Sequence, residues 1–397
     1  MDDMEFPTPD VPVESVSPRE LKDRIDAGED VTLLDARMTS DYEEWRIDGD
    51  SVESINIPYF EFLDDEIAEE HLDAVPEDRP VVALCAKGGA SEYVAGRLTE
   101  HGFEVTHLAD GMNGWARIYE PVPIASYDGP GTVLQYQRTS SGCLGYLVYS
   151  NGEAAVIDPL RTFTDQYFDD AAEFGVELTY ALDTHIHADH ISGLRELADA
   201  GVESYLPKRS ADRGATYVES VNLLKDGDTV SVGDVTIEAV ATPGHTTDMT
   251  SYLVGDSLLL TGDGLFPESV ARPDLEEGDE GAPEAARMLY DSLHERVLSL
   301  PDETLIGGAH YSDAATPAAD GTYTATIGDL QEQMDALSMA KDDFVDLILS
   351  DMPPRPPNYE TIIATNLGQH DADDEEAFEL ELGPNNCAAS QGSLAAD

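Results

Sequence analysis

The chain has 397 residues, of which 41% are hydrophobic, so it is long enough for two domains and apolar enough to fold. Its 82 acidic residues against 21 basic ones give a formal net charge of −61. This balance disfavours nucleic-acid binding, because phosphate contacts need clustered Lys and Arg. The acids are spread through segments that otherwise look globular, which is typical of the solvated surface of a halophilic protein.

The three cysteines, Cys85, Cys143 and Cys387, lie far apart and form no Cys-x-x-Cys pair. This favours a reducing, cytoplasmic location over a disulfide framework. The sequence shows no secretory leader and no apolar run long enough to span a membrane, so we expect no membrane partner. Assembly into a homo-oligomer is left open.

The first 122 residues alternate between helix and strand. Residues 1–12 predict a flexible tail, and Ser17-Pro18 begins a helix that Gly28 ends. This alternation indicates a parallel α/β sheet flanked by helices. The further elements expected here are strands at 31–35, 55–58, 81–85 and 103–108, and a helix at 91–101.

A glycine-containing loop, Cys85-Ala86-Lys87-Gly88-Gly89-Ala90-Ser91, joins one of these strands to the next helix. Its backbone N–H groups and the helix N-terminus favour an anion, so Cys85 is expected to act as a thiolate. Lys87, Gly88 and Gly89 are candidate substrate-binding residues. A buried cysteine at the end of a strand can equally be structural.

This loop, together with Leu33-Leu34-Asp35-Ala36-Arg37 and the segment 108–115, resembles a rhodanese domain over residues 13–122. The resemblance implies that Cys85 forms a persulfide cradled by loop amides and takes part in sulfur transfer. Ala90 stands where such loops usually carry Arg, which bears on the choice of sulfur donor.

After a linker at 123–130, the pattern changes to closely spaced strands and predicts an α+β domain over 131–370, an αββα sandwich of two sheets. Pro283 is expected at the first position of a helix. Residues 371–397 predict an acidic, disordered tail. The expected strands are 132–137, 145–149, 154–157, 180–183, 229–232, 235–241, 251–254, 257–261 and 304–307, and the expected helices are 163–174, 191–198, 283–298 and most of 324–350.

The run Thr184-His185-Ile186-His187-Ala188-Asp189-His190 places three histidines and an aspartate between a strand and a helix. Imidazole and carboxylate together suit Zn or Fe(II). Three more residues of this kind, His245, Asp263 and His310, each come just after an apolar strand. All of them could therefore converge at one edge of the sandwich.

This order of residues resembles the metallo-β-lactamase fold. The resemblance implies two metal positions: His185, His187, His245 and Asp263 line one, and Asp189, His190, Asp263 and His310 line the other. Since the fold includes both zinc hydrolases and iron oxygenases, it does not decide the chemistry.

Further segments resemble the persulfide dioxygenases, including those fused to rhodanese domains: Cys143 with 145–148, 155–159, Ala271-Arg272-Pro273-Asp274, 352–359 and 366–368. In that group His185, His245 and Asp263 would bind one Fe(II) per chain. His187, Asp189, His190 and His310 would then orient ligands and water, and Arg272 and Tyr311 would hold the carboxylates of the thiol carrier.

The resemblance implies oxidation of a low-molecular-weight thiol persulfide by O₂ to sulfite, and sulfur transfer at Cys85 that could yield thiosulfate. Two alternatives stay open. One is a thioester hydrolase of the glyoxalase II type with two Zn ions. The other is a non-enzymatic sulfur-carrier or sulfide-sensing module.

The charge generates a first prediction. Transfer from molar KCl to about 0.1 M KCl lengthens the screening distance from about 3 Å to about 10 Å. The acidic side chains on the surface then repel one another more strongly, which destabilises the folded state. We expect the far-ultraviolet circular dichroism to show loss of structure on this dilution. Spectra that do not change would contradict a salt-dependent surface.

Overall fold

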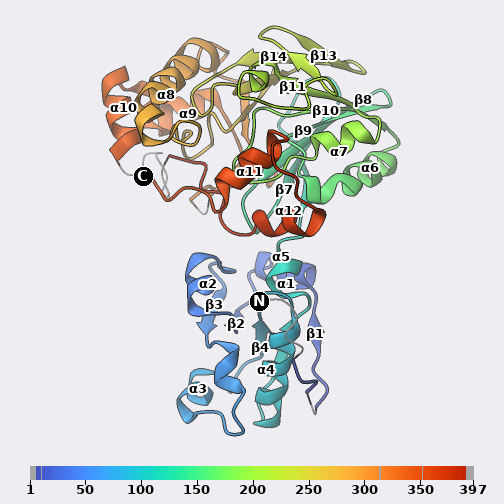
Figure 1. Ribbon diagram of the computed structural model, residues 1–397, viewed down its shortest axis with the longest axis vertical. Coiled ribbons are helices and arrows are strands. Elements are labelled where there is room, and N and C mark those ends of the chain that lie inside the picture. Colours follow the sequence, from blue (N-terminus) through green and yellow to red (C-terminus); the bar gives the residue numbers. More distant parts are fainter. Residues whose placement is uncertain (1–5, 10, 313, 351, 390–397) are drawn as a thin grey trace. The chain divides into compact units, whose positions relative to one another are not determined.

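The computed structural model describes residues 6–9, 11–312, 314–350 and 352–389. The chain divides into two compact units (Figure 1). The first extends to Ile118 and includes Arg138–Ser141, and the second comprises Tyr119–Gln137 and the chain from Gly142 onward.

The first unit is built on a five-stranded sheet in which every pair of neighbours is parallel, in the order β1-β5-β4-β2-β3. Strands β2 and β4 are buried along their whole length, as expected where helices cover both faces. The predicted α/β class of this unit is confirmed. Its strands are β1 (Ser15–Val16), β2 (Val31–Asp35), β3 (Val52–Asn56), β4 (Val81–Leu84) and β5 (Val105–Leu108), and its α-helices are α1 (Pro18–Asp26), α2 (Thr39–Glu44), α3 (Glu69–Ala74), α4 (Gly89–Glu100) and α5 (Gly111–Trp115).

The start of α1 follows from its sequence. The Ser17 hydroxyl accepts a hydrogen bond from the Glu20 N–H at 3.2 Å, and Pro18 takes the first helical position. The segment before it differs from the expected flexible tail. Phe6 packs edge-on against Tyr59, with ring centroids 5.2 Å apart, while residues 1–5 and 10 lie outside the described residues.

The second unit contains two sheets. One, with seven strands in the order β12-β11-β10-β9-β8-β7-β6, is antiparallel from β6 to β9 and parallel from β9 to β12. The other has six strands in the order β13-β14-β15-β16-β17-β18. The first sheet consists of β6 (Glu120–Pro123), β7 (Thr132–Gln137), β8 (Leu144–Ser150), β9 (Glu153–Ile157), β10 (Glu177–Leu182), β11 (Glu203–Pro207) and β12 (Asn222–Leu224). The second consists of β13 (Thr229–Val232), β14 (Val235–Ala241), β15 (Thr250–Val254), β16 (Leu258–Gly262), β17 (Leu305–Gly308) and β18 (Thr324–Thr326).

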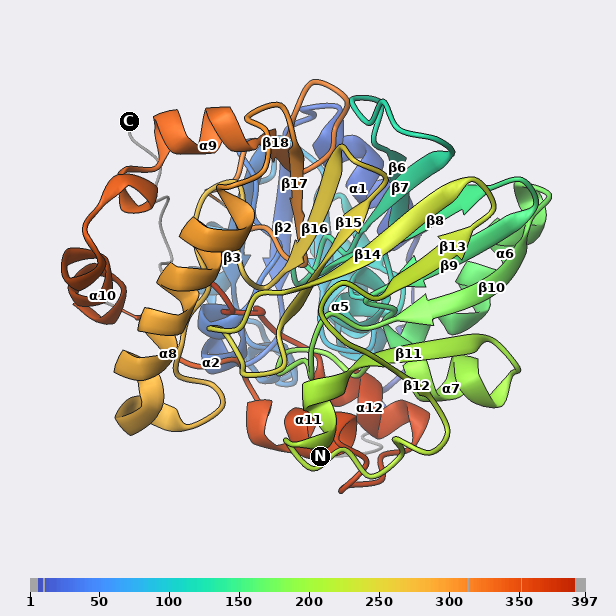
Figure 2. The same ribbon diagram turned by 90° about the horizontal axis from the view of Figure 1, so that it is seen from above.

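Helices cover the outer faces of both sheets (Figure 2). Apolar side chains of the two inner faces form one core between the sheets, including Tyr146 and Ile157 from one sheet and Tyr252 and Leu260 from the other. A core on each outer face completes the predicted αββα sandwich. The helices are α6 (Thr164–Glu173), α7 (Leu194–Asp199), α8 (Gly278–Ser292), α9 (Ile327–Gln333), α10 (Lys341–Ser350), α11 (Tyr359–Asn366) and α12 (Asp374–Leu380).

Three expectations about the second unit are wrong. Part of the segment interpreted as the end of one domain and a linker is the edge strand β6, paired with β7. Helix α8 begins at Gly278, so Pro283 lies inside it. The expected disordered tail is ordered over 371–389, because α12 buries Phe378, and Cys387 is fully buried further along. Residues 390–397 lie outside the described part of the chain.

The candidate site residues of the second unit follow strand ends. Asp158 follows β9, His185 and its neighbours follow β10, His245 follows β14, Asp263 follows β16 and His310 follows β17. Helices of the described ranges are all too short or too polar to cross a membrane.

Candidate metal centre

The loop Thr184–His190 is held in place by acidic and amide side chains from distant segments. Asp158 accepts hydrogen bonds from the Thr184 N–H at 2.7 Å and the Thr184 hydroxyl at 3.0 Å. Asp248 accepts from the Ile186 N–H at 3.1 Å. The Asn366 amide donates to the carbonyls of His187 and His190 at 3.0 and 2.8 Å. These bonds fix the backbone of the loop from which the histidine side chains project.

His185, His245 and Asp263 converge on one point. Asp263 Oδ2 lies 3.6 Å from His185 Nε2 and 3.4 Å from His245 Nε2, and all three side chains are fully buried. Within the described residues, none of these three atoms has a hydrogen-bond partner. Buried polar atoms are nearly always paired, so three unpaired atoms aimed at each other fit a divalent cation.

The remaining nitrogens orient the two imidazoles for this role. His245 Nδ1 lies 2.8 Å from the Arg272 carbonyl oxygen, to which it donates, so its Nε2 carries the free lone pair. His185 Nδ1 lies 2.9 Å from the Thr184 hydroxyl. Burial lowers the pKa of both histidines, that of His185 well below its usual value, and this favours the neutral form that binds metals.

His310 lies between two carboxylates. Its Nδ1 is 2.6 Å from Asp263 Oδ1 and its Nε2 is 2.6 Å from Asp189 Oδ2. Burial alone would lower the pKa of His310, but Asp189 and Asp263 outweigh it and raise the pKa well above the usual value. The contact with His310 holds Asp263 Oδ1, while Asp263 Oδ2 has no hydrogen-bond partner among the described residues.

The other histidines of the loop lie beside this set. His190 Nδ1 is 3.2 Å from Asp189 Oδ2. Burial lowers the pKa of His190, but the neighbouring Asp189 carboxylate outweighs burial and raises this pKa well above its usual value. His187 Nε2 is 3.1 Å from Asp158 Oδ1, in a separate buried cluster with Asp183. His187 Nδ1 and His190 Nε2 have no hydrogen-bond partner among the described residues.

Arg272 differs from its expected role. Its five N–H donors all engage the chain: two bind Asp274 at 2.7 and 3.1 Å, and the others bind the carbonyls of Pro353, Pro354 and Asn386 at 3.0, 2.8 and 2.9 Å. No donor is left in this arrangement for a carboxylate of a thiol carrier. The Tyr311 ring stacks on Tyr323 with centroids 3.7 Å apart.

The structure also places two cysteines at the centre. The Cys143 thiol donates to Asp189 Oδ2 at 3.1 Å. The Cys387 sulfur lies within 4.8 Å of ligand atoms of Asp189, Asp263 and His310. Burial, followed by the carboxylate of Asp263, raises the pKa of Cys387 well above its usual value. Sequence reasoning missed Cys387 as a site residue, since nothing near it in the sequence indicates a metal.

Asp158 was missed as well, although its position offers a recognisable pattern. It follows an apolar strand just as Asp263 does, and its φ of +51° is rare for a residue with a side chain. The carboxylate can then face the histidine loop.

Cys85 in the first unit has the expected surroundings. Its sulfur accepts hydrogen bonds from the N–H groups of Gly88 at 3.1 Å and Ser91 at 3.4 Å. Gly88 adopts a φ of +92°, and a Cβ at Gly111 would lie 2.1 Å from the Cys85 carbonyl oxygen. Gly88 is buried, whereas Lys87 and Gly89 are exposed at the loop. Two backbone N–H donors therefore converge on this one sulfur.

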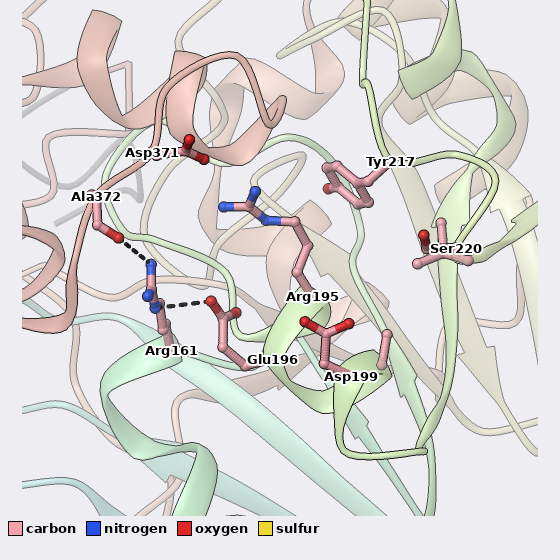
Figure 3. A pocket seen from close by; sticks show the side chains of 10 residues that line it. Arg161, Arg195, Glu196, Asp199, Tyr217, Ser220, Asp371 and Ala372 are labelled. Atoms are coloured by element: carbon pink, nitrogen blue, oxygen red, sulfur yellow. Dashed lines mark hydrogen bonds and ion pairs between the residues drawn. The ribbon is translucent and has the colours of Figure 1, made fainter.

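Two cavities of the second unit differ in their relation to the metal centre. One, of about 160 Å³, reaches His245 and is lined by Glu276, Glu277 and Glu284. The other, of about 280 Å³, is lined by Arg161 and Arg195 and contains none of the candidate ligands (Figure 3). There Arg161 bonds Glu196 and the Ala372 carbonyl, and Arg195 lies over the Tyr217 ring. Of these two cavities, the first is the one that a candidate metal ligand lines.

Family models match both halves of the chain. The metallo-beta-lactamase superfamily matches residues 139–310, and the rhodanese-like domain matches residues 17–118. These matches confirm the two kinds of fold expected from the sequence.

The curated relatives include a persulfide dioxygenase and a probable metallo-hydrolase. The human mitochondrial persulfide dioxygenase ETHE1 is 29% identical over 219 residues, covering 54% of this chain and 78% of that protein. A probable metallo-hydrolase of Burkholderia pseudomallei (strain 1710b) is 31% identical over 264 residues, covering 54% of this chain and 84% of its own. The crystal structure of ETHE1 from Myxococcus xanthus has a TM-score of 0.51 at 29% identity, covering 59% of this chain and 98% of that one.

The unpaired atoms predict metal-dependent stability. A cation that binds only the folded state at a hundredfold excess over its Kd adds about 2.7 kcal/mol to the free energy of unfolding. We expect Fe(II) or Zn(II), added anaerobically to metal-free protein in molar KCl, to raise the Tm of the protein. Asp263→Asn removes the anionic ligand at nearly constant shape and should abolish most of this rise. As a control, Asp170→Asn alters a carboxylate that accepts a hydrogen bond from the Tyr136 hydroxyl. This variant should keep the metal-dependent rise in Tm. An equal rise in the Asp263 variant would place the metal elsewhere.

Proposed function

Because the chain belongs to the metallo-beta-lactamase superfamily and carries a rhodanese-like domain, we propose that it is an iron-dependent persulfide dioxygenase with a sulfurtransferase domain. The observation that carries this proposal is the set of two imidazole nitrogens and one carboxylate oxygen left unpaired at one buried point. Two histidines and one carboxylate with open positions are the ligand set of non-haem Fe(II) oxygenases. The similarity to persulfide dioxygenases of human and bacterial origin supports sulfur as the element oxidised.

The reaction combines one persulfide, one O₂ and one water to give one thiol, one sulfite and two protons. Fe(II) bound by His185, His245 and Asp263 would supply the redox chemistry that lets O₂ react with a sulfur anion. The chain itself supplies orientation. The Arg272 carbonyl fixes the His245 ring, the Thr184 hydroxyl contacts the His185 ring, and His310 fixes Asp263. Complete burial of the three ligands limits the access of water to the site.

The contacts of Asp189 and His310 favour one metal rather than two. A bound ion lies about 2.0–2.2 Å from each N or O ligand, so two ligands of one ion are usually separated by about 3 Å or more. Asp189 Oδ2 and His310 Nε2 are only 2.6 Å apart, which is a direct hydrogen bond. Binding of a second ion by both residues would require this hydrogen bond to break.

A second candidate is the zinc thioester hydrolase. It is favoured by the unpaired His187 Nδ1, His190 Nε2 and Asp189 Oδ1, and by the similarity to a probable metallo-hydrolase. It needs two ions, and so the hydrogen bond between Asp189 and His310 would have to open.

The proposed role of the first unit rests on the Cys85 cradle. The N–H groups of Gly88 and Ser91 would stabilise the terminal sulfur of a Cys85 persulfide as they do the thiol sulfur. We propose that sulfur passes at Cys85 between a persulfide and the sulfite–thiosulfate pair. Sulfite attacks the outer sulfur, the bond between the two sulfurs breaks, and thiosulfate and the Cys85 thiolate are formed.

Metal analysis and O₂ uptake test the dioxygenase. Protein purified without O₂ should contain about one iron per chain and consume one O₂ for each sulfite formed from glutathione persulfide. Asp263→Asn should lose both the iron and the O₂ uptake. Two zinc ions per chain, with thioester cleavage and no O₂ uptake, would establish the hydrolase instead.

Replacement of the rhodanese thiol separates the two sites. Cys85→Ser should abolish thiosulfate formation from persulfide and sulfite, because no sulfur can be carried, while persulfide-dependent O₂ uptake and iron content persist. Thiosulfate formation, O₂ uptake and iron content are measured on the same preparation. Loss of O₂ uptake in this variant at unchanged iron content would show that the two reactions share Cys85.

A further inference from the structure

The cavity beside α7 is lined by side chains of both charges. Its volume is about 280 Å³, and it shares no residue with the candidate metal centre (Figure 3). Pockets for drug-sized ligands occupy about 300–1,000 Å³, so a cavity of this size suits a smaller molecule. Its walls are α7, the segments around Tyr217 and Asp371, and the side chain of Arg161.

Arg161 belongs to the frame of this cavity. Its guanidinium lies 2.9 Å from Glu196 Oε1 and donates to the Ala372 carbonyl at 3.0 Å and to Asp374 Oδ1 at 2.9 Å. These contacts join α7 to the segment that leads into α12. Arg161 therefore holds two walls together, and its charge is already balanced by carboxylates of the chain.

Arg195 on α7 is the cation that this frame leaves available. Within the described ranges its guanidinium forms no hydrogen bond and no ion pair, which is unusual in a chain with 82 acidic and 21 basic residues. The guanidinium carbon lies 5.5 Å from the centroid of the Tyr217 ring, a cation–π distance. Figure 3 shows the guanidinium between Tyr217 and Asp371. Contact with the ring thus orders a cation whose N–H groups have no partner in the described chain.

Other polar groups of the lining add donors and acceptors. Burial raises the pKa of Tyr217, so its hydroxyl stays protonated and can donate a hydrogen bond. Ser220 contributes a second hydroxyl. Asp199 and Asp371 also line the cavity, and neither carboxylate forms an ion pair with a described residue. The cavity therefore presents one available guanidinium, two hydroxyl groups and two available carboxylates.

We propose that this cavity binds a small zwitterion that carries a carboxylate and an ammonium group, as a free α-amino acid does. The ligand carboxylate pairs with the planar Arg195 guanidinium, which can donate two parallel hydrogen bonds, and accepts a third from the Tyr217 hydroxyl. The ligand ammonium group pairs with the carboxylates of Asp199 and Asp371. These carboxylates repel a simple anion and Arg195 repels a simple cation, so the cavity selects a ligand with both charges.

The proposed ligand would bridge segments that flank the histidine loop. The Arg161 N–H donates to the Ile191 carbonyl at 2.9 Å, and the Asn366 side-chain oxygen accepts from the Ser192 N–H at 2.9 Å. A molecule that binds across α7 and the segment around Asp371 binds only the folded second unit, and it therefore raises the free energy of unfolding.

Thermal denaturation and calorimetry of the full-length, metal-loaded protein in molar KCl test the binding. We expect at least one of the standard α-amino acids to raise the Tm and to give a saturable titration. The analogue of that amino acid without its amino group keeps the carboxylate and the carbon skeleton. It should bind about 10-fold or more weakly, because one charge-assisted contact is lost.

Substitutions in the lining locate the ligand. Arg195→Gln removes a charge that has no partner in the described chain, so the fold should persist while the affinity for the amino acid falls by about 10-fold or more. Tyr217→Phe keeps the ring and should weaken binding as well, which provides a second measurement if Arg195→Gln is unstable. Asp371→Asn should weaken binding of the amino acid but not of its analogue. Arg287→Gln is the matched control, because Arg287 lies on α8 outside the cavity and should leave binding unchanged.

Three results would overturn the proposal. If none of the standard amino acids binds, Arg195 is only a solvated cation. If the analogue without the amino group binds as tightly as the amino acid, the cavity is a simple anion site. If Arg195→Gln and Tyr217→Phe both bind the amino acid as tightly as the unaltered protein does, the ligand lies elsewhere.

Discussion

The structure depends on three buried ligand atoms that have no partner within the described chain. Leaving a buried polar atom unpaired costs about 1–3 kcal/mol, so His185, His245 and Asp263 together destabilise a metal-free fold. The three side chains keep these positions because hydrogen bonds and packing around them hold the loops that carry them. A bound cation offsets this cost, and metal binding and folding of the second unit are therefore coupled.

The supporting contacts come from segments that are far apart in sequence. Asp158 and Asp248 hold the amides of the histidine loop, and Asn366 holds its carbonyls. The C-terminal segment of residues 383–389 is anchored through the Arg272 guanidinium, which donates to the Asn386 carbonyl. His245 is oriented by the carbonyl of that same arginine.

The chain has a large excess of acidic residues, and several of its few arginines lie in the interior. The 82 acidic residues outnumber the 21 basic ones and give the net charge of −61, whereas several of the few arginines are buried, including Arg37, Arg138 and Arg272. Each of these buried arginines bonds a carboxylate or a backbone carbonyl, so the cations serve to fix loops and segments. A salt-dependent surface can then coexist with sites whose geometry depends little on salt, because buried pairs are weakly screened.

The sequence by itself determined the two fold classes, most strands and the candidate ligands His185, His245 and Asp263. Strand and helix patterns are local, and each of these ligands comes within a few residues of the end of a strand. Only the tertiary structure decided that Asp158 and Asn366 hold the loop, that the guanidinium of Arg272 is fully engaged, and that the C-terminal segment returns to the metal centre. Asn366 contacts the carbonyl of His187 across 179 residues, and Cys387 lies in a segment whose composition predicts disorder. Contacts of this range leave no periodic or local pattern, because they arise only when separate elements pack together.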